Sequence, residues 1–510
     1  MVFRLILILA AMLGFGTGVL WSQGSDVHLE QRQWFVTRTA HFNIHSCGSL
    51  ADTYKLAARL EQFCEVYAML AGTNAVVSQP IVVMAFPDED SLKPFLPLYQ
   101  GQPANLSGFF TRSSDENLIV LALPNSAPGS PGMEVIFHEY AHLLFRNNDR
   151  IWPLWLKEGM AEIYSTFETT EYEAQIARPI NHHLRLMAHE SLMPLQNLFA
   201  VTHDSPEYNE STRQGIFYAE SWLLTHYLMA GDNPAAKAHF GNFTQLLRQG
   251  QLPEQAFTNA LRTSLPEMET ELRNYFERGE FTPITLTLSK DAASPIMVNS
   301  RVMTPVEVYF SLGDELLRIH RFDDAEKYFE RAKKFAPASP LPYEGFGLLA
   351  VQRDKHEEAM RDFAEAVQLG STSFLAYYIY AQEKYNLTAD PLGRYAPLKG
   401  AEAEEIPAEL EKSIELMPNF ARAHELLGFF ELVQGQNLTE AEEQSQIAVQ
   451  MEPENPSYLL TLAQVQFRER DPAAARRTLE PLLLPNANAQ LRASAESLLQ
   501  EMKRADFQAR

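Results

Sequence analysis

Basic residues are scarce in this chain. Lysine and arginine number 42 against 65 aspartates and glutamates, which gives a formal net charge of -23 over 510 residues. A surplus of this sign repels the phosphate backbone of nucleic acids and the anionic headgroups of lipid surfaces. The composition therefore disfavours nucleic-acid binding, and we expect no nucleic-acid partner.

Cysteine is nearly absent, since only Cys47 and Cys64 occur. Residues 51–70 carry the apolar stripe of an amphipathic helix, formed at steps of three and four by Leu56, Leu60, Phe63, Tyr67 and Leu70. A rise of about 1.5 Å per residue puts Cys64 roughly 20 Å from the start of this helix. Because a disulfide needs Cα atoms within about 7 Å, we predict a buried thiol at Cys64 and no disulfide.

The chain begins with a cation, Arg4, and an apolar run from Leu5 to Leu20. A run of roughly 16 residues is near the lower limit for a membrane span. No clear small-x-small cleavage site follows it, and no cysteine follows to carry a lipid anchor. Residues 1–24 are predicted to be a signal peptide, with an N-terminal anchor as the alternative. Either one predicts an exported protein (periplasmic, cell-envelope or secreted), in contact with a membrane only if the segment is retained.

The length of 510 residues favours two or three domains. An α+β domain is predicted over residues 25–280. Its strand-like segments are residues 42–44, 81–86 and 117–123, and the pattern from residue 133 to about 272 is mostly helical. Residues 281–304 carry few periodic apolar residues and are predicted to be a linker.

An internal repeat begins near residue 305. Five residues recur 34 positions later: Tyr309, Gly313, Ala325, Phe329 and Ala332 return as Tyr343, Gly347, Ala359, Phe363 and Ala366. The period and the small residues around an aromatic are similar to the tetratricopeptide pattern of paired helices. Weaker units follow, with an insertion around residues 389–405 and a terminal cap at residues 490–502. We predict an all-α tetratricopeptide solenoid over residues 305–510, whose concave surface holds a peptide or another protein.

A helix predicted over residues 133–145 carries the sequence His-Glu-x-x-His. His138 and His142 are one turn apart on one face, the spacing at which two imidazoles share one zinc ion. Glu139 is rotated by about 100° from His138. Its carboxylate is thereby placed beside the open position of the metal, where it can take a proton from bound water.

A second helix follows after about ten residues and is opened by Pro153. If the two helices pack as an antiparallel hairpin, Glu158 comes over the histidine pair as a third ligand, and Gly159 and Ala161 allow a close approach of the backbones. Glu162, one turn beyond Glu158, is placed to accept a hydrogen bond from the outer nitrogen of a ligand histidine.

These two motifs resemble those of the gluzincins, the thermolysin-like zinc metallopeptidases, and especially their peptidase MA-like domains. The resemblance is strongest over residues 133–164. It implies an α+β metallopeptidase domain, with a small mixed sheet and a helical zinc-binding hairpin. The metal ligands of the family then correspond to His138, His142 and Glu158, its general base to Glu139, and its outer acid to Glu162. Zinc would activate a water and polarise the scissile carbonyl while Glu139 transfers the proton.

One departure from the family pattern bears on the kind of peptidase. Aminopeptidases of this clan carry a Gly-x-Met-Glu-Asn strand well upstream of the site, whereas here Gly132 and Met133 lie at the start of the helix and lack that spacing. We therefore expect an endopeptidase. The edge strand for an extended substrate is predicted at residues 117–123, with a buried strand as the alternative.

The donor for the oxyanion has candidates on a later aromatic-rich helix, Tyr218, His226 and Tyr227, although such residues are more often core residues. His182 and His183 match no ligand pattern and are predicted to lie on a solvated face. Two functions therefore stay open. The first is a zinc peptidase whose repeats recruit substrate or an adaptor, and the second is a cell-envelope repeat scaffold with an inactive metallopeptidase-like domain.

Overall fold

The computed structural model divides into two compact units. The first includes Ile81–Arg112 and Asn117–Val302, and the second includes Met303–Arg510; they are called the N-terminal unit and the repeat unit. The residues described by the structure are 29–72, 81–104, 106–113, 116–126, 130–145, 152–170, 172–209, 211–231, 234–288, 299–453, 455–484 and 488–508. The predicted signal peptide or anchor at residues 1–24 lies outside them. None of the described helices is long and apolar enough to cross a membrane.

The N-terminal unit contains a mixed six-stranded sheet with the order β11-β1-β2-β3-β7-β6. β2, β3 and β7 are mutually parallel neighbours, and the remaining pairs are antiparallel. The strands are β1 (Phe35–Arg38), β2 (Phe42–Ser46), β3 (Ile81–Phe86), β6 (Gly108–Arg112), β7 (Asn117–Ala122) and β11 (Asn299–Val302). This agrees with the small mixed sheet predicted from the sequence.

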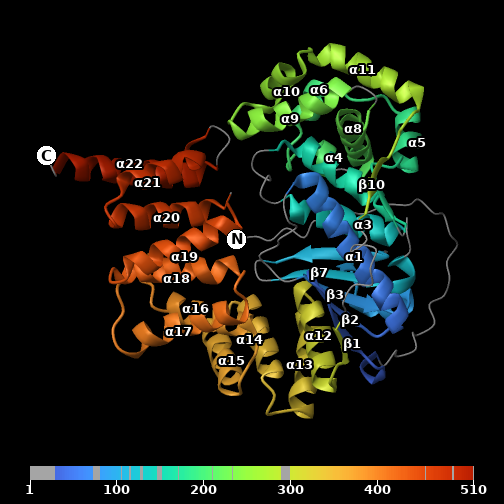
Figure 1. Cartoon of the computed structure of the whole chain (residues 1–510). Coiled ribbons are helices and arrows are strands. Elements are labelled where there is room, and N and C mark those ends of the chain that lie inside the picture. Colours follow the sequence, from blue (N-terminus) through green and yellow to red (C-terminus); the bar gives the residue numbers. More distant parts are fainter. Residues whose placement is uncertain are drawn as a thin grey trace. The chain divides into compact units, whose positions relative to one another are not determined.

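Helix α1 (Leu50–Ala71) covers one face of this sheet, as Figure 1 shows. Ile44, Val83 and Ile119 stand opposite one another in register and share a core with Phe63 of α1 and Phe137 of the later helix α3. The rings of Phe63 and Phe137 stack with centroids 4.6 Å apart. Both cysteines are free and buried, which confirms the prediction of a core thiol at Cys64.

The remaining elements of the N-terminal unit are mostly helical. The short strands are β4 (Leu98–Tyr99), β5 (Gln102–Pro103), β8 (Glu168–Thr169), β9 (Glu173–Ile176) and β10 (Ile284–Thr287). The helices are α2 (Glu89–Leu92), α3 (Pro131–Leu144), α4 (Leu154–Ser165), α5 (Asn181–His189), α6 (Leu195–Ala200), α7 (Pro206–Asn209), α8 (Ser211–Met229), α9 (Pro234–Arg248), α10 (Pro253–Leu261) and α11 (Leu265–Arg278).

Two segments of the predicted linker, residues 281–304, are strands of the N-terminal unit. β10 pairs with β9, and β11 pairs with β1. The four residues of β11 are exposed or half-exposed, so its sequence lacks the apolar alternation by which a strand is recognised. Pairing with a strand more than 250 positions earlier, Asn299 opposite Arg38 for example, places it in the sheet.

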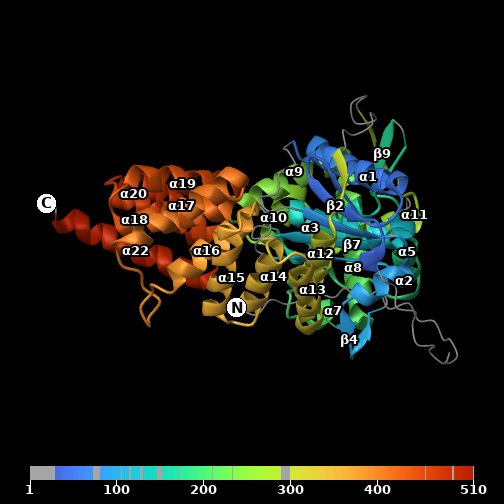
Figure 2. The same cartoon turned by 90° about the horizontal axis from the view of Figure 1, so that it is seen from below.

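The repeat unit is an array of helical pairs of the tetratricopeptide type, as the 34-residue period predicts (Figure 2). The ring of Phe329 lies between two glycines of neighbouring helices: a Cβ on Gly313 would come within 2.5 Å of this ring, and one on Gly345 within 2.4 Å. The helices are α12 (Pro305–Arg318), α13 (Phe322–Phe335), α14 (Leu341–Gln352), α15 (His356–Gln368), α16 (Phe374–Asn386), α17 (Ala401–Leu416), α18 (Ala421–Gln434), α19 (Leu438–Met451), α20 (Pro456–Arg468), α21 (Pro472–Leu479) and α22 (Ala489–Gln508).

The cap lies where the sequence predicts it, whereas the insertion predicted around residues 389–405 ends earlier, because residues 401–405 belong to α17. Residues 387–400 separate α16 from α17 without regular secondary structure. At the other end, α22 buries Ala495, Leu498 and Met502 against residues of α20 and α21. This helix covers apolar surface that the last helical pair would otherwise leave open.

Candidate metal centre

Helix α3 carries the two histidines and forms where the sequence predicts a helix. Ser130 caps its first turn, and its side chain accepts a hydrogen bond from the backbone N–H of Met133. Ile136, Phe137 and Tyr140 are fully buried in the core. His138 and His142 project from another face of the same helix.

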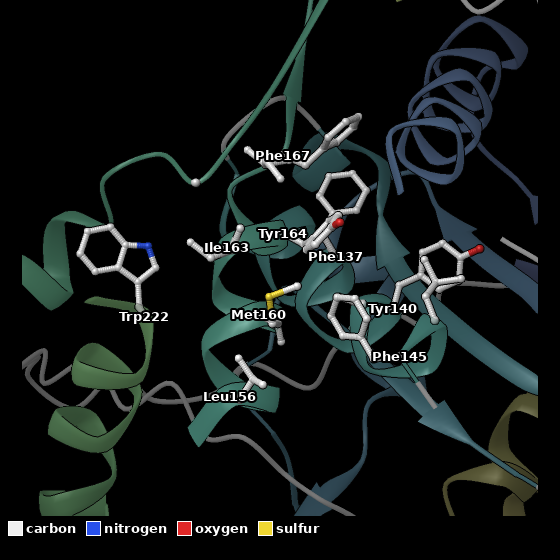
Figure 3. Packing of buried hydrophobic residues seen from close by; sticks show 14 of the residues in the cluster. Phe137, Tyr140, Phe145, Leu156, Met160, Ile163, Tyr164, Phe167 and Trp222 are labelled. Atoms are coloured by element: carbon white, nitrogen blue, oxygen red, sulfur yellow. The ribbon is translucent and has the colours of Figure 1, made fainter. Parts of the chain in front are cut away.

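Helix α4 brings Glu158 to the histidines. Pro153 stands at its N-terminus, as expected, and α3 and α4 pack together as a hairpin. Figure 3 shows the apolar side of this contact, where Met160 and Tyr164 of α4 face Phe137 and Tyr140 of α3. The side chain of Glu158 is 4% exposed. The hairpin thus puts a carboxylate of α4 beside two imidazoles of α3.

Three ligand atoms converge at this point: Nε2 of His138, Nε2 of His142 and Oε2 of Glu158. The two nitrogens lie 3.2 Å apart, and the oxygen lies 3.2 Å from His142 and 3.4 Å from His138. A tetrahedral zinc with bonds of about 2.0–2.1 Å holds its ligands about 3.3 Å apart. The three separations therefore fit one face of a zinc coordination tetrahedron.

Glu139, the predicted general base, follows His138 directly on α3 and is partly exposed. Its negative charge is one of the causes that raise the pKa of His138. Arg112, at the end of strand β6, donates from Nη2 to the backbone carbonyl of Glu139 at 3.3 Å. Glu139 is thus next in the chain to a candidate ligand and partly open to solvent.

The electrostatics of the cluster favour a positive charge at its centre. Burial lowers the pKa of His138, but a hydrogen bond to Glu158 and the charge of nearby carboxylates outweigh burial and raise it to about 9. Burial raises the pKa of Glu158, but the charge of His142 and hydrogen bonds to both imidazoles outweigh it and hold this pKa well below its usual range. Glu158 is therefore an ionised carboxylate in a buried place, and the imidazoles of His138 and His142 compensate its charge.

Two further side chains contact the ligands from outside. Oε1 of Glu162 lies 3.5 Å from Nδ1 of His138, as the sequence predicts for an outer acid. The hydroxyl of Tyr208, on the short helix α7, donates to Oε1 of Glu158 at 3.3 Å. Tyr208 is not among the residues that the sequence singles out, because it lies 50 positions from Glu158 and belongs to no motif.

The structure separates the three candidates for the oxyanion donor. His226 is fully buried and bonded through Nδ1 to the hydroxyl of Tyr275 and through Nε2 to the carbonyl of Ala177. The hydroxyl of Tyr227 donates to Glu271. These two are structural residues, and only Tyr218 is near the cluster, with its ring 6.1 Å from that of His138.

The predicted solvated face at His182 and His183 is wrong for His183. His182 is exposed, whereas His183 is 3% exposed, and its Nε2 lies 3.4 Å from Oε2 of Glu162. Successive residues of a helix point about 100° apart, so one of two adjacent histidines can face solvent while the other faces the core.

Two other details of the site differ from the sequence prediction. The strand at residues 117–123 is β7, which is buried along its length between β3 and β6; the alternative of a buried strand is therefore confirmed, and β6 is the edge strand. Gly159 faces helix α8 rather than α3: a Cβ there would come within 2.1 Å of Oγ1 of Thr225 and 2.3 Å of the carbonyl oxygen of Ser221.

A second group with metal-binding side chains, His41, Glu61 and Cys64, does not fit a metal ion. Nδ1 of His41 and Oε2 of Glu61 lie 2.6 Å apart, a hydrogen-bond distance that is too short for two ligands of one zinc. Cys64 is bonded to the hydroxyl of Tyr140, and burial raises the pKa of its thiol. Of the two groups found among the described residues, only the one around His138 fits.

No protein-family model matches the chain, and neither does any curated protein. Solved structures similar to it are repeat proteins. YrrB, a TPR protein with an unusual peptide-binding site, is 16% identical over 37% of this chain and 90% of its own, with a TM-score of 0.31. MamA of Desulfovibrio magneticus RS-1 is 20% identical over 35% and 93%, with a TM-score of 0.29. A thermophilic TPR protein of Thermus thermophilus is 20% identical over 38% and 99%, with a TM-score of 0.28. Similarity at this level assigns no function to the chain.

Proposed function

We propose that this protein is a zinc-dependent peptidase whose repeats recruit a protein partner or substrate. The observation that carries the proposal is the triangle of His138, His142 and Glu158, with ligand atoms 3.2, 3.2 and 3.4 Å apart. Two imidazole nitrogens and one carboxylate oxygen, with a fourth position left open, form a donor set typical of catalytic zinc. When bound, zinc would supply Lewis acidity toward a carbonyl and toward water.

Glu139 is proposed as the general base. Its carboxylate accepts a proton from the attacking water and returns it to the leaving amine nitrogen when the peptide bond breaks. Its partial exposure suits this task, because the base must meet both water and substrate. Glu162 accepts a hydrogen bond from Nδ1–H of His138. The proton thereby stays on Nδ1, and the lone pair of Nε2 is directed at the metal position.

An extended substrate is proposed to pair with β6, the edge strand. β6 contacts α3, and an edge strand offers unpaired backbone groups to a peptide. Tyr218 is the remaining candidate for the donor to the developing oxyanion. Because binding along an edge strand does not require a free amino terminus, we favour an endopeptidase. The apolar run Leu5–Leu20 supports the proposal that the enzyme acts outside the cytoplasm.

A second candidate function is a protein-binding scaffold with an inactive metallopeptidase-like domain. It is supported by the helical pairs of residues 305–483 and their cap α22, since arrays of this type present an extended surface to a partner. The two functions differ in whether any peptide bond is hydrolysed.

Substitution of the proposed base tests the peptidase function. Glu139→Gln removes the proton acceptor and keeps the shape, so we expect cleavage to fall by about 10²–10⁴-fold while bound zinc stays at the wild-type level. Glu277→Gln, at an exposed residue of α11, is the matched control and should retain activity. Metal content is measured by elemental analysis, and cleavage of a mixed peptide library by mass spectrometry.

The outcomes separate the two candidates. Cleavage that survives Glu139→Gln would contradict the proposed mechanism. Stoichiometric zinc in a wild-type protein that cuts no peptide of the library would favour the scaffold.

A further inference from the structure

A buried series of side chains continues outward from the proposed metal centre. Oε1 of Glu162 lies 3.5 Å from Nδ1 of His138, and Oε2 of the same carboxylate lies 3.4 Å from Nε2 of His183. The side chains of the two histidines are 8% and 4% exposed, and that of Glu162 is 14% exposed. One carboxylate thus stands between two imidazoles, with one oxygen toward each.

Helix α5 fixes the position of His183. This helix packs against α8 and buries His183 and Met187 on its inner face. The imidazole lies 6.4 Å from the indole ring of Trp222, measured between ring centroids. Both of its ring nitrogens are buried and make no hydrogen bond among the described residues. The 3.4 Å approach of Nε2 to Oε2 of Glu162 is thus a contact at ion-pair distance.

The physical reason for such an arrangement is the cost of a buried carboxylate. A carboxylate removed from water needs partners for both oxygens, since an uncompensated oxygen costs free energy and lets the group rotate or take up a proton. His138 can serve one oxygen of Glu162 only. The imidazole of His183 lies 3.4 Å from the other oxygen and approaches from a different helix, so its charge when protonated compensates that of the carboxylate.

We propose that His183 is a positioning residue of the metal centre. It holds Glu162 in the orientation in which that carboxylate accepts a hydrogen bond from Nδ1–H of His138. The proton then stays on Nδ1, and Nε2 of His138 presents its lone pair to the metal. The inference rests on the proposed function, because it requires that His138 bind zinc. If the inference holds, zinc affinity depends also on a residue of α5, which lies outside the α3–α4 hairpin.

Zinc affinity of the full-length protein tests this role. Loss of an outer partner typically weakens metal binding by about 10–100-fold, and we expect His183→Phe to raise the zinc dissociation constant about 10-fold. His183→Gln keeps a donor near the position of Nε2 and should stay within about 3-fold of wild type. The matched control is His182→Phe, on the exposed neighbour, which should have no effect.

The measurement is competition with a chromophoric chelator, together with the visible spectrum of the cobalt-substituted protein. The spectrum reports the geometry of the ligands, which a merely structural role of His183 would not change. If His183→Phe does not fold, as judged by circular dichroism of the metal-free protein, His183→Asn replaces it. Asparagine places its donor near the position of Nδ1, so weaker zinc binding with Asn than with Gln supports the same conclusion.

Unchanged zinc affinity and an unchanged cobalt spectrum in both His183→Phe and His183→Asn would overturn the positioning role while leaving the proposed function intact. An equal loss in His182→Phe and His183→Phe would also overturn it. A wild-type protein that binds no zinc would overturn the proposed function and this inference together.

Discussion

The buried carboxylates of the N-terminal unit differ in how their charge is compensated. Glu158 faces the imidazoles of His138 and His142, and Glu162 lies between those of His138 and His183. Glu220 on α8 has no imidazole partner in the part of the chain that the structure describes, and its Oε2 accepts a hydrogen bond from the backbone N–H of Met193 at 2.9 Å. Burial, with the negative charge of Glu269, raises the pKa of Glu220 to about 8 against the effects of that hydrogen bond and of the positive charge of Arg273. This residue therefore makes stability depend on pH.

The sign follows from the two states of the protein. In the unfolded chain Glu220 loses its proton near its ordinary pKa of about 4.5, and in the folded protein near 8. Its contribution to stability is fully present below pH 4.5 and is lost as the pH rises toward 8. Glutamine at position 220 cannot ionise. We therefore expect the melting temperature of Glu220→Gln minus that of wild type to be larger at pH 8 than at pH 5. An equal difference at both pH values, in thermal unfolding followed by circular dichroism, would refute this.

At the scale of elements, the candidate metal centre depends on three helices in contact. α3 carries the histidines, α4 carries Glu158, and α8 packs against α4 through the open side of Gly159. No side chain fits at that glycine, since even a Cβ would overlap atoms of Ser221 and Thr225. The backbone of α8 is thereby kept close to the residue that follows Glu158.

Gly159→Ala is therefore expected to push α4 and α8 apart. We expect a loss of about 1–3 kcal/mol in the free energy of unfolding and weaker zinc binding, because Glu158 moves with the backbone of α4. The control is Gly241→Ala in α9, where an added Cβ meets nothing within 4 Å. This change should be neutral or stabilise by up to about 1 kcal/mol. Urea unfolding measures both, and equal effects would contradict the packing argument.

At the scale of the whole molecule, each of the two units has apolar residues of its own to bury. The N-terminal unit is organised around one large cluster between sheet and helices, whereas the repeat unit buries residues pair by pair. In such arrays each repeat contacts only its neighbours, so damage to one repeat stays local. We therefore expect a core substitution in the repeat unit to lower the stability of that unit and to leave the N-terminal unit unchanged.

Phe329→Ala tests this at the repeat whose ring fills the space beside Gly313 and Gly345. Phenylalanine-to-alanine changes in a core cost about 3–5 kcal/mol, and we expect a loss of this size in the unfolding of the repeat unit with zinc affinity unchanged. Phe335→Ala, at a side chain that is 58% exposed, is the control. A fall in zinc affinity with Phe329→Ala would show that the units are coupled.

The sequence alone predicts the features that depend on local periodicity. The helix with His138 and His142, the helix with Glu158 and Glu162, the repeat period and the buried thiol of Cys64 all follow from spacings within a few turns. Side chains three or four positions apart share a helix face whatever the rest of the chain does. For the same reason these predictions agree with the structure in both position and type of element.

Only the tertiary structure decides which residues from distant segments meet. Tyr208 reaches Glu158 across 50 positions, β11 joins the sheet as an exposed strand, and β6 takes the edge that the sequence assigns to β7. His183 and His182 are alike in sequence, and only the packing of α5 turns one of them toward Glu162. Such contacts depend on how helices and strands pack. The area that they bury and the charge that they compensate arise only in the folded protein, so no local sequence pattern predicts them.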